Sequence, residues 1–145
     1  MMKTDAGWII SLDVSTLFVA AACIVSLLGL FLLLAWKQDH IRALGWWGAA
    51  YLLGGFSIAL WAMAGSGASS LPPGLPNALL LVACGMMWSA ARLFHGREIL
   101  WAAMLVGATA WLLALQLPDF DQSAGQRIVL SSLIMSTYVF LIALN

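Results

Sequence analysis

Five stretches of the chain are apolar over about the length that a helix needs to cross a membrane. They predict helices over residues 14–36, 44–64, 75–94, 99–117 and 128–144. The hydrocarbon core of a bilayer requires roughly 20 apolar residues per helix, with a range of about 17 to 25. Within these stretches the only charged residue is Arg92, near the end of the third, and histidine is absent. The uncharged interiors argue against ion or proton transport, which relies on ionisable residues inside the membrane.

The composition excludes an ordinary soluble domain. Hydrophobic residues make up 63% of the chain and charged residues 8%, whereas soluble domains are about 45 to 50% apolar and about 25% charged. Each membrane segment must satisfy its own backbone hydrogen bonds, and the loops are short. We therefore expect an all-α, polytopic helical bundle of five transmembrane helices that forms a single domain, residues 1–145. The formal net charge is zero and basic runs are absent, so nothing indicates a nucleic-acid partner.

The positions of lysine and arginine predict how the bundle is oriented. The loop after the first stretch carries Lys37 and Arg42, and the loop after the third carries Arg92 and Arg97, whereas residues 65–74 are uncharged. Cytoplasmic loops of membrane proteins retain positive charge. We therefore expect the N-terminus outside and the C-terminus in the cytoplasm.

Residues at the ends of the stretches support these boundaries. The N-terminal segment lacks the features of a cleavable signal peptide, and Asp13 is suited to cap the first helix. Pro72, Pro73 and Pro76 precede or open the third helix, and Pro118 closes the fourth. Tryptophans mark two membrane interfaces: Trp36, Trp46, Trp47, Trp88 and Trp101 at the cytoplasmic one, and Trp8 and Trp61 at the other.

Small residues recur at a spacing of four, which lets helix backbones approach closely. The pairs are Ala50 and Gly54, Gly55 and Ala59, Ala103 and Gly107, and Ala110 and Ala114. They predict that the second and fourth helices are central, and they leave open whether the pairs serve packing within the chain or a homodimer. Ser132 and Ser136 share one face of the fifth helix, where they could hydrogen-bond to another helix.

Residues with metal or redox chemistry are few. Cys23 and Cys84 fall at similar depths on helices of the same direction, so they either form a soft-metal or redox pair or fill buried space as small thiols. His40 and His95 fall in loops, which argues against bis-histidine haem ligation inside the bundle. Residues 119–125 resemble the start of a calcium loop, but its twelfth position is a leucine where a glutamate is required. We expect neither a metal nor a cofactor.

Three further groups of residues suggest binding rather than catalysis. Trp61, Trp111 and Met63 could line a ligand pocket toward the outer end, although a tryptophan near the interface is typically an anchor. At the other end Arg92 and Arg97 either reach lipid phosphates or dock a cytoplasmic partner. The polar residues available for a transport path in the first four helices are Ser26, Ser57, Asn77, Ser89 and Thr109. GxSxG, HExxH, Walker and dinucleotide-binding patterns are absent, so we assign no catalytic residue and expect the chain itself not to be an enzyme.

Long parts of the chain resemble the N-terminal membrane region of bacterial GGDEF-domain diguanylate cyclases. The resemblance lies in residues 44–65, LGWWGAAYLLGGFSIALWAMAG, in residues 76–97, PNALLLVACGMMWSAARLFHGR, and in the helix after them. Residues 12–19, LDVSTLFV, and 127–134, RIVLSSLI, are similar to that region as well. The resemblance implies a location in the bacterial cytoplasmic (inner) membrane and a cytoplasmic output domain that makes cyclic di-GMP. The GG(D/E)EF signature, the metal-binding aspartates and the inhibitory RxxD site are absent from this sequence, so none of the family's catalytic residues carries over.

We therefore expect a membrane-anchoring and sensory input domain of a bacterial signalling protein. The chain ends at Asn145 directly after the fifth apolar stretch, which favours a fragment of a longer protein. Its expected partners are the lipid bilayer, a C-terminal cytoplasmic output domain and a second copy of the chain. The alternative is a small stand-alone integral membrane subunit or scaffold of a complex.

Overall fold

The computed structural model describes residues 14–65, 72, 74–118, 120 and 123–145, which form five helices and no strand. The helices are α1 (Val14–Asp39), α2 (Arg42–Gly65), α3 (Leu75–Phe94), α4 (Trp101–Ala114) and α5 (Ala124–Ala143). This confirms the predicted all-helical class, and α1, α2, α3 and α5 are long and apolar enough to cross a membrane. The predicted cap at Asp13 lies outside the described residues.

Local signals explain where α1 ends and where α3 begins and ends. α1 continues to Asp39 and stops where His40 adopts a left-handed φ of 56°, with its N–H donating to the Trp36 carbonyl at 2.8 Å. α3 has the predicted bounds, and Pro76 in its first turn lacks only an N–H that would have no helical partner there. At its other end the His95 N–H donates to the carbonyls of the last turn.

The last two helices differ from their predicted bounds of 99–117 and 128–144. α5 begins earlier, at Ala124, because the Ser123 hydroxyl accepts a hydrogen bond from the Gln126 N–H at 3.4 Å and so caps the helix. α4 is shorter, with 14 residues. Such a helix is about 21 Å long, less than the roughly 30 Å of a bilayer core. By length alone, four of the five helices reach across a membrane.

After α4 the backbone continues as a tighter helical turn. The Gln116 N–H donates to the Leu113 carbonyl and the Leu117 N–H to the Ala114 carbonyl, both at 3.1 Å. Bonds of this i to i+3 spacing are typical of a 3₁₀ turn, which often ends an α-helix. The apolar pattern continues unchanged through the turn, which is why the sequence predicted a longer helix.

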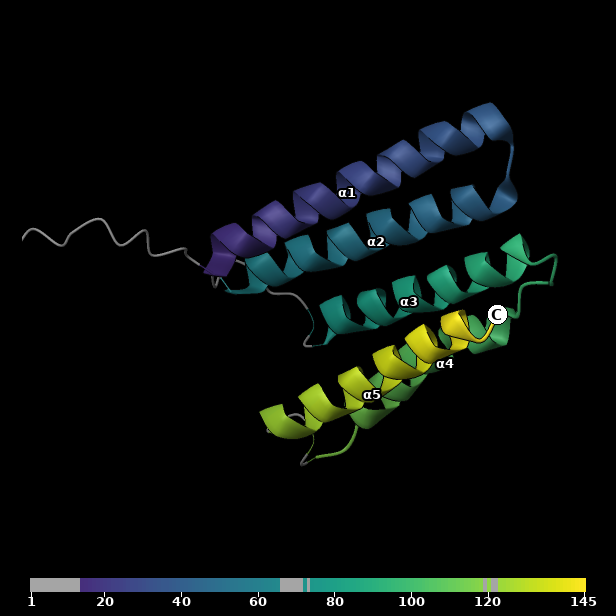
Figure 1. Cartoon of the computed structure of the whole chain (residues 1–145). Coiled ribbons are helices and arrows are strands. Elements are labelled where there is room, and N and C mark those ends of the chain that lie inside the picture. The colour runs from purple at the N-terminus through teal and green to yellow at the C-terminus, as the bar shows by residue number, and fades with distance from the viewer. Residues whose placement is uncertain (1–13, 66–71, 73, 119, 121–122) are drawn as a thin grey trace, which may run out of the picture.

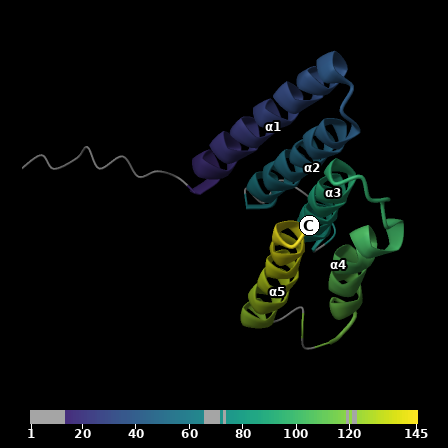
Figure 2. The same ribbon diagram turned by 45° about the vertical axis from the view of Figure 1, so that its right-hand side comes forward.

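The helices alternate in direction, and α3 is the element on which the others assemble (Figure 1). α1 contacts only α2, α2 contacts α3, and both α4 and α5 pack on α3, while α4 and α5 meet each other mainly at Gly107 and Tyr138. Figure 2 shows α4 and α5 as separate columns beside α3. The prediction that the second and fourth helices are central was therefore wrong for the fourth: the central helices are α2 and α3. α3 is also the most buried of the four long helices.

The alternation brings all the short basic loops to one end of the bundle. Lys37, Arg42, Arg92 and Arg97 lie at this end, which we call the basic end, together with the C-terminal Asn145. A hydrogen bond of 3.0 Å from Arg97 Nη1 to Asn145 Oδ1 joins the α3–α4 loop to the end of α5. The opposite end, where α2, α4 and α5 have their other termini, is called the far end below.

Small residues bring the helix backbones together, but only in part at the predicted pairs. Gly55 and Gly107 are tightly packed, whereas a Cβ on Gly54 would meet only Ala83 Cβ at 3.9 Å, and Gly29 and Gly85 were not predicted. A Cβ on Gly29 of α1 would lie 2.9 Å from the Gly48 carbonyl oxygen of α2, and a Cβ on Gly55 would overlap the Ser26 side chain. A Cβ on Gly85 of α3 would overlap the carbonyl oxygen of Met104 on α4. At these three places only a hydrogen atom fits between the helices, so glycine sets the distance between them.

We expect Gly85→Ala to destabilise the bundle by about 1 to 3 kcal/mol, because the added methyl must displace the backbone of Met104. Gly54→Ala is the matched control. Its Cβ would meet only Ala83 Cβ at 3.9 Å, and alanine favours the helix by up to about 1 kcal/mol. The measurement is unfolding of the purified chain in mild detergent as the fraction of SDS rises. Equal stability of the two variants would contradict the close approach of α3 and α4.

Candidate functional site

The two cysteines do not form a site. Cys23 is exposed on α1 and Cys84 is half-buried on α3. α2 lies between these helices, and α1 and α3 share no contact. The alternative of a soft-metal or redox pair is therefore excluded, and the expectation of buried small thiols fits Cys84 only in part and Cys23 not at all.

The histidines lie outside the helices, as predicted, and cap helix ends. His40 joins α1 to α2, and His95 Nδ1 lies 2.9 Å from the Ala91 carbonyl in the last turn of α3. Both side chains are exposed at the basic end. Among the described residues, groups of three or more His, Cys, Asp or Glu side chains that could hold a metal ion are absent. Asp119 and Asp121 of the calcium-like loop lie outside those residues.

Three of the polar residues available for a transport path, Ser57, Ser89 and Thr109, bond to backbone carbonyls in the described helices. Ser57 Oγ donates to the Pro76 carbonyl at 2.6 Å and Ser89 Oγ donates to the Gly85 carbonyl at 2.9 Å, and both serines are fully buried. Thr109 Oγ1 bonds to carbonyls of its own helix. These hydroxyl groups donate their hydrogen bonds to backbone carbonyls and are not aligned along a pore.

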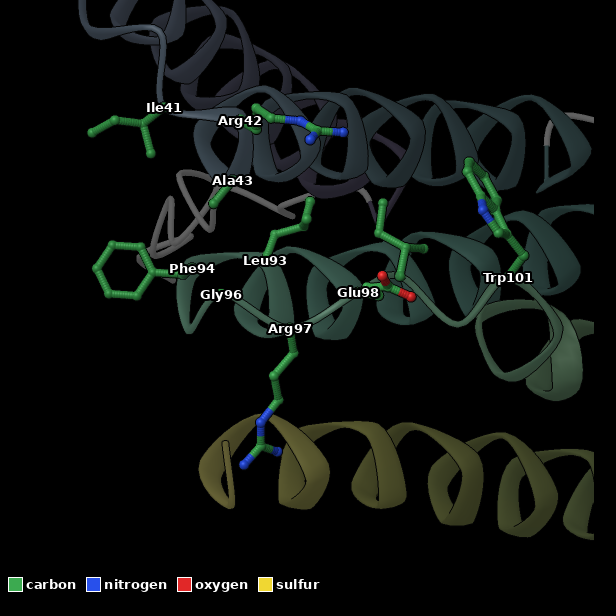
Figure 3. Close-up of a pocket in the computed structure, with 10 residues that line it drawn as sticks. Ile41, Arg42, Ala43, Leu93, Phe94, Gly96, Arg97, Glu98 and Trp101 are labelled. Atoms are coloured by element: carbon green, nitrogen blue, oxygen red, sulfur yellow. The ribbon is translucent and has the colours of Figure 1, made fainter.

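A cavity of about 710 Å³ lies at the basic end between the start of α2 and the α3–α4 loop (Figure 3). We call it the basic-end cavity. Its charged members are Arg42, Arg97 and Glu98, and its apolar members include Phe94 and Trp101. In Figure 3 Arg97 extends from the loop toward α5, away from the cavity. The cavity is thus open and of mixed polarity, with one arginine turned elsewhere.

The arginines proposed for lipid or partner contact also bond within the chain. Arg92 Nε donates to the Glu98 carbonyl at 3.0 Å, which holds the α3–α4 loop against the end of α3. The Arg92 guanidinium also lies 5.2 Å from the centre of the Trp88 ring, a distance at which a cation is attracted to an aromatic face. Arg97 bonds to Asn145. Both therefore serve to fix the basic end in addition to any external contact.

Aromatic rings pack across the helices at this end. Trp46 on α2 and Trp101 on α4 lie edge to face with centroids 5.4 Å apart. Trp47 on α2 and Phe94 on α3 lie 6.0 Å apart. The tryptophans assigned to one interface from the sequence thus cluster at one end and also contribute to helix packing.

A second cavity, of about 490 Å³, opens at the far end, and we call it the far-end cavity. Trp61 of α2, Asn77 of α3 and Trp111 of α4 line it, with Arg127 and Ser131 from the first turns of α5. Four helices therefore contribute to one site. Its lining combines aromatic faces with an amide, a guanidinium and a hydroxyl, which suits an amphipathic small molecule.

The far-end cavity was anticipated in part. The sequence placed Trp61 and Trp111 at a possible pocket, and both line it, whereas Met63 is exposed and does not. The contributions of Arg127 and Ser131 were missed. Both residues lie in the first turns of α5. Because α5 begins earlier than predicted, Arg127, which was expected in a loop, lies on a helix.

Trp111 anchors this end of the bundle. Its side chain is 1% exposed, and its Nε1–H donates to the Gly74 carbonyl at 3.0 Å. The ring meets Phe120 edge to face at 5.9 Å, within a core cluster that also holds Leu81. Trp111 is thus the buried residue of the cavity lining, and Trp61, whose side chain is 43% exposed, is the one that a ligand can reach.

The fold and cavities define an all-helical protein with membrane-length helices and a ligand-sized cavity at each end. No protein-family model, curated protein or solved structure matches the chain. The resemblance to the membrane region of diguanylate cyclases accordingly stays a prediction from the sequence.

Trp111→Phe should lower the free energy of unfolding by about 1 to 3 kcal/mol, since it removes the hydrogen bond to Gly74 and leaves space in the core. Trp61→Phe is the control, and as a partly exposed position it should change stability by less than about 0.5 kcal/mol. Thermal unfolding in detergent measures both. Equal losses for the two variants would mean that Trp111 does not anchor the far end.

Proposed function

We propose that the chain is the membrane-anchoring and sensory input domain of a bacterial signalling protein. The observation that carries the proposal is the placement of α5. Its first turns line the far-end cavity, and Asn145, which follows the helix, bonds to Arg97 of the α3–α4 loop at the basic end. A single helix therefore connects a ligand-sized site with the point where the chain would continue into an output domain.

The proposed topology has five crossings. α3 and α5 run in the same direction, so if both span the membrane the chain must cross back between them, and α4 is the segment that does so. The 14-residue helix supplies about 21 Å. The extended residues before it and the 3₁₀ turn after it, at about 3.3 and 2.0 Å per residue, bring the total near the bilayer thickness.

We assign the basic end to the cytoplasm, in the inner membrane of a bacterium. The four lysine and arginine residues of that end support this orientation, because positive loops are retained on the cytoplasmic side. The N-terminus then lies outside and Asn145 inside. The far-end cavity faces the extracytoplasmic side, where an external signal would reach it.

α5 is suited to respond to a ligand because little of it is buried. Tyr138 is its one fully buried residue among those described, and α5 packs mainly on α3. A ligand that contacts Ser131 together with Trp61 would favour one position of α5 over another. Two packings that differ by a few kcal/mol would suffice for a switch.

The proposed output is a cytoplasmic diguanylate cyclase domain after Asn145, as the resemblance implies. Dimeric association of the chain would let a movement of α5 change the relation between two such domains. An alternative is a stand-alone membrane subunit or scaffold. The observation that favours this alternative is that α1 contacts only α2. Its other apolar side chains are exposed, and another membrane protein could pack on them.

The topology predicts opposite accessibility of two engineered cysteines. In a background with Cys23→Ala and Cys84→Ala, a membrane-impermeant maleimide added to intact cells should label Gly125→Cys and leave Gln38→Cys unlabelled until the cells are opened. An added Cβ at Gly125 meets nothing within 4 Å, so the substitution is tolerated. Labelling of both from outside would contradict the five-crossing topology, and the reverse pattern would invert the orientation.

The sensory proposal predicts that output depends on the helical register of α5. A cyclase domain fused after Asn145, with one to four alanines inserted at the junction, should show activity that falls and recovers with a period near 3.6 residues, because each residue rotates the attached domain by about 100°. The measurement is cyclic di-GMP formed by membranes containing each fusion. Activity that does not vary with register would leave the chain as a passive anchor.

A further inference from the structure

A groove separates α4 from α5 on the surface of α3. Both helices pack on α3, and they meet each other where Tyr138 and Ile134 of α5 lie against Gly107 of α4, while their ribbons stand as separate columns in Figure 2. The groove has a volume of about 250 Å³ and is lined by Val106 and Ala110 of α4, by Ile134 and Leu141 of α5, and by Trp88 of α3. We call it the α4–α5 groove. Apolar cavities of about 150 Å³ already bind molecules the size of benzene.

Trp88 lines this groove, and its indole N–H is an unpaired donor. The side chain is 6% exposed, and its Nε1–H is the one buried side-chain polar group without a hydrogen-bond partner among the described residues. A buried donor without an acceptor is costly and requires an explanation. The other indole in the core, Trp111, has its acceptor in Gly74.

The neighbouring polar groups are already engaged. Tyr138 Oη donates to the carbonyls of Ala103 and Met104 and accepts from the Gly107 N–H. Thr137 Oγ1 donates to a carbonyl of its own helix. A water molecule in the groove would find few of the two to four polar partners that buried water needs. The missing acceptor therefore points to an apolar molecule that carries a carbonyl.

Positive charge lies directly above this donor. Arg92 is one helical turn from Trp88 toward the basic end, and its guanidinium lies 5.2 Å from the centre of the Trp88 ring. A guanidinium has five N–H donors, and the Glu98 carbonyl accepts from Nε. Arg97 lies beside it at the end of α5. Donors for an anion thus lie at the basic end and an indole N–H lies about 6 Å further into the bundle.

We propose that the α4–α5 groove binds an anionic glycerophospholipid. One acyl chain fills the groove, an ester carbonyl accepts the hydrogen bond from Trp88 Nε1, and the phosphate lies against Arg92 and Arg97. This order of phosphate, ester and chain matches the order of guanidinium, indole and apolar lining along α3. The proposal does not depend on the sensory function or on the far-end cavity.

The test is lipid retention by the full chain, measured by native mass spectrometry from detergent micelles titrated with phosphatidylglycerol or phosphatidylcholine. We expect one phosphatidylglycerol per chain, bound more tightly than phosphatidylcholine. Trp88→Phe, which keeps the ring and removes the donor, should weaken this binding about three- to ten-fold. Arg92→Gln should remove the preference for the anionic lipid. Inorganic phosphate should not displace the lipid, because the apolar groove contributes to its binding.

A second pair of variants tests the groove itself. Ala110→Leu fills the groove and should abolish the bound lipid, whereas Ala102→Leu, at an exposed position of α4 outside the groove, should retain it. Thermal unfolding in lipid-free detergent verifies that each variant is folded. Retention unchanged in both Trp88→Phe and Ala110→Leu would overturn the proposal. So would loss of a dimer, rather than of lipid, in Ala110→Leu, since the groove would then hold a second copy.

Discussion

The carbonyl of Met104 is the point at which the second half of the bundle is joined. On one side it lies so close to Gly85 of α3 that a single methyl group would not fit between them. On the other side it accepts a hydrogen bond of 3.2 Å from Tyr138 of α5. α5 packs mainly on α3, and this hydrogen bond ties it to α4 as well. A close approach at one glycine of α3 therefore places a carbonyl that the last helix also uses.

Polar side chains in the described helices stabilise the fold by bonding to backbone carbonyls of their own or a neighbouring helix. Ser57 joins α2 to the first turn of α3, Trp111 joins α4 to Gly74, and Tyr138 joins α5 to α4. In a membrane there is no hydrophobic force between helices, so close packing and such bonds must hold them together. Trp88 breaks this rule, because its buried indole N–H has no acceptor.

The sequence predicted the features that depend on local chemistry. The bounds of α3 followed from its prolines, and the grouping of basic loops at one end followed from the number of helices. The bounds of α4 and α5 did not follow. The end of α4 was missed because the turn after it is largely apolar, like the helix itself. The start of α5 was missed because its cap, Ser123, lies in a polar segment typical of a loop.

Which helices are central could not be predicted, because a membrane helix is apolar on the side that faces lipid as well as on the side that faces its neighbours. The spacing of small residues indicated close contacts but not their partners, so α4 was placed in the centre instead of α3. Likewise, Trp61 and Trp111 suggested the far-end cavity, whereas Arg127 joins it through the early start of α5, and Ser131 lies on the predicted helix without a signal that it lines a cavity. Ser132 and Ser136, expected to bond across helices, are exposed, and Tyr138 makes the cross-helix bonds of α5 instead.

The attachment of α1 has a consequence for how the chain is assembled. Because α1 touches only α2, the core cluster of Ala78, Leu81, Ala108, Trp111 and Phe120 is complete without it. α1 therefore has only α2 to pack on, and it contributes no residue to the basic-end cavity, the far-end cavity or the α4–α5 groove. α1 is thus a peripheral helix whose place in the bundle depends on two close approaches to α2, Gly29 at Gly48 and Ser26 at Gly55.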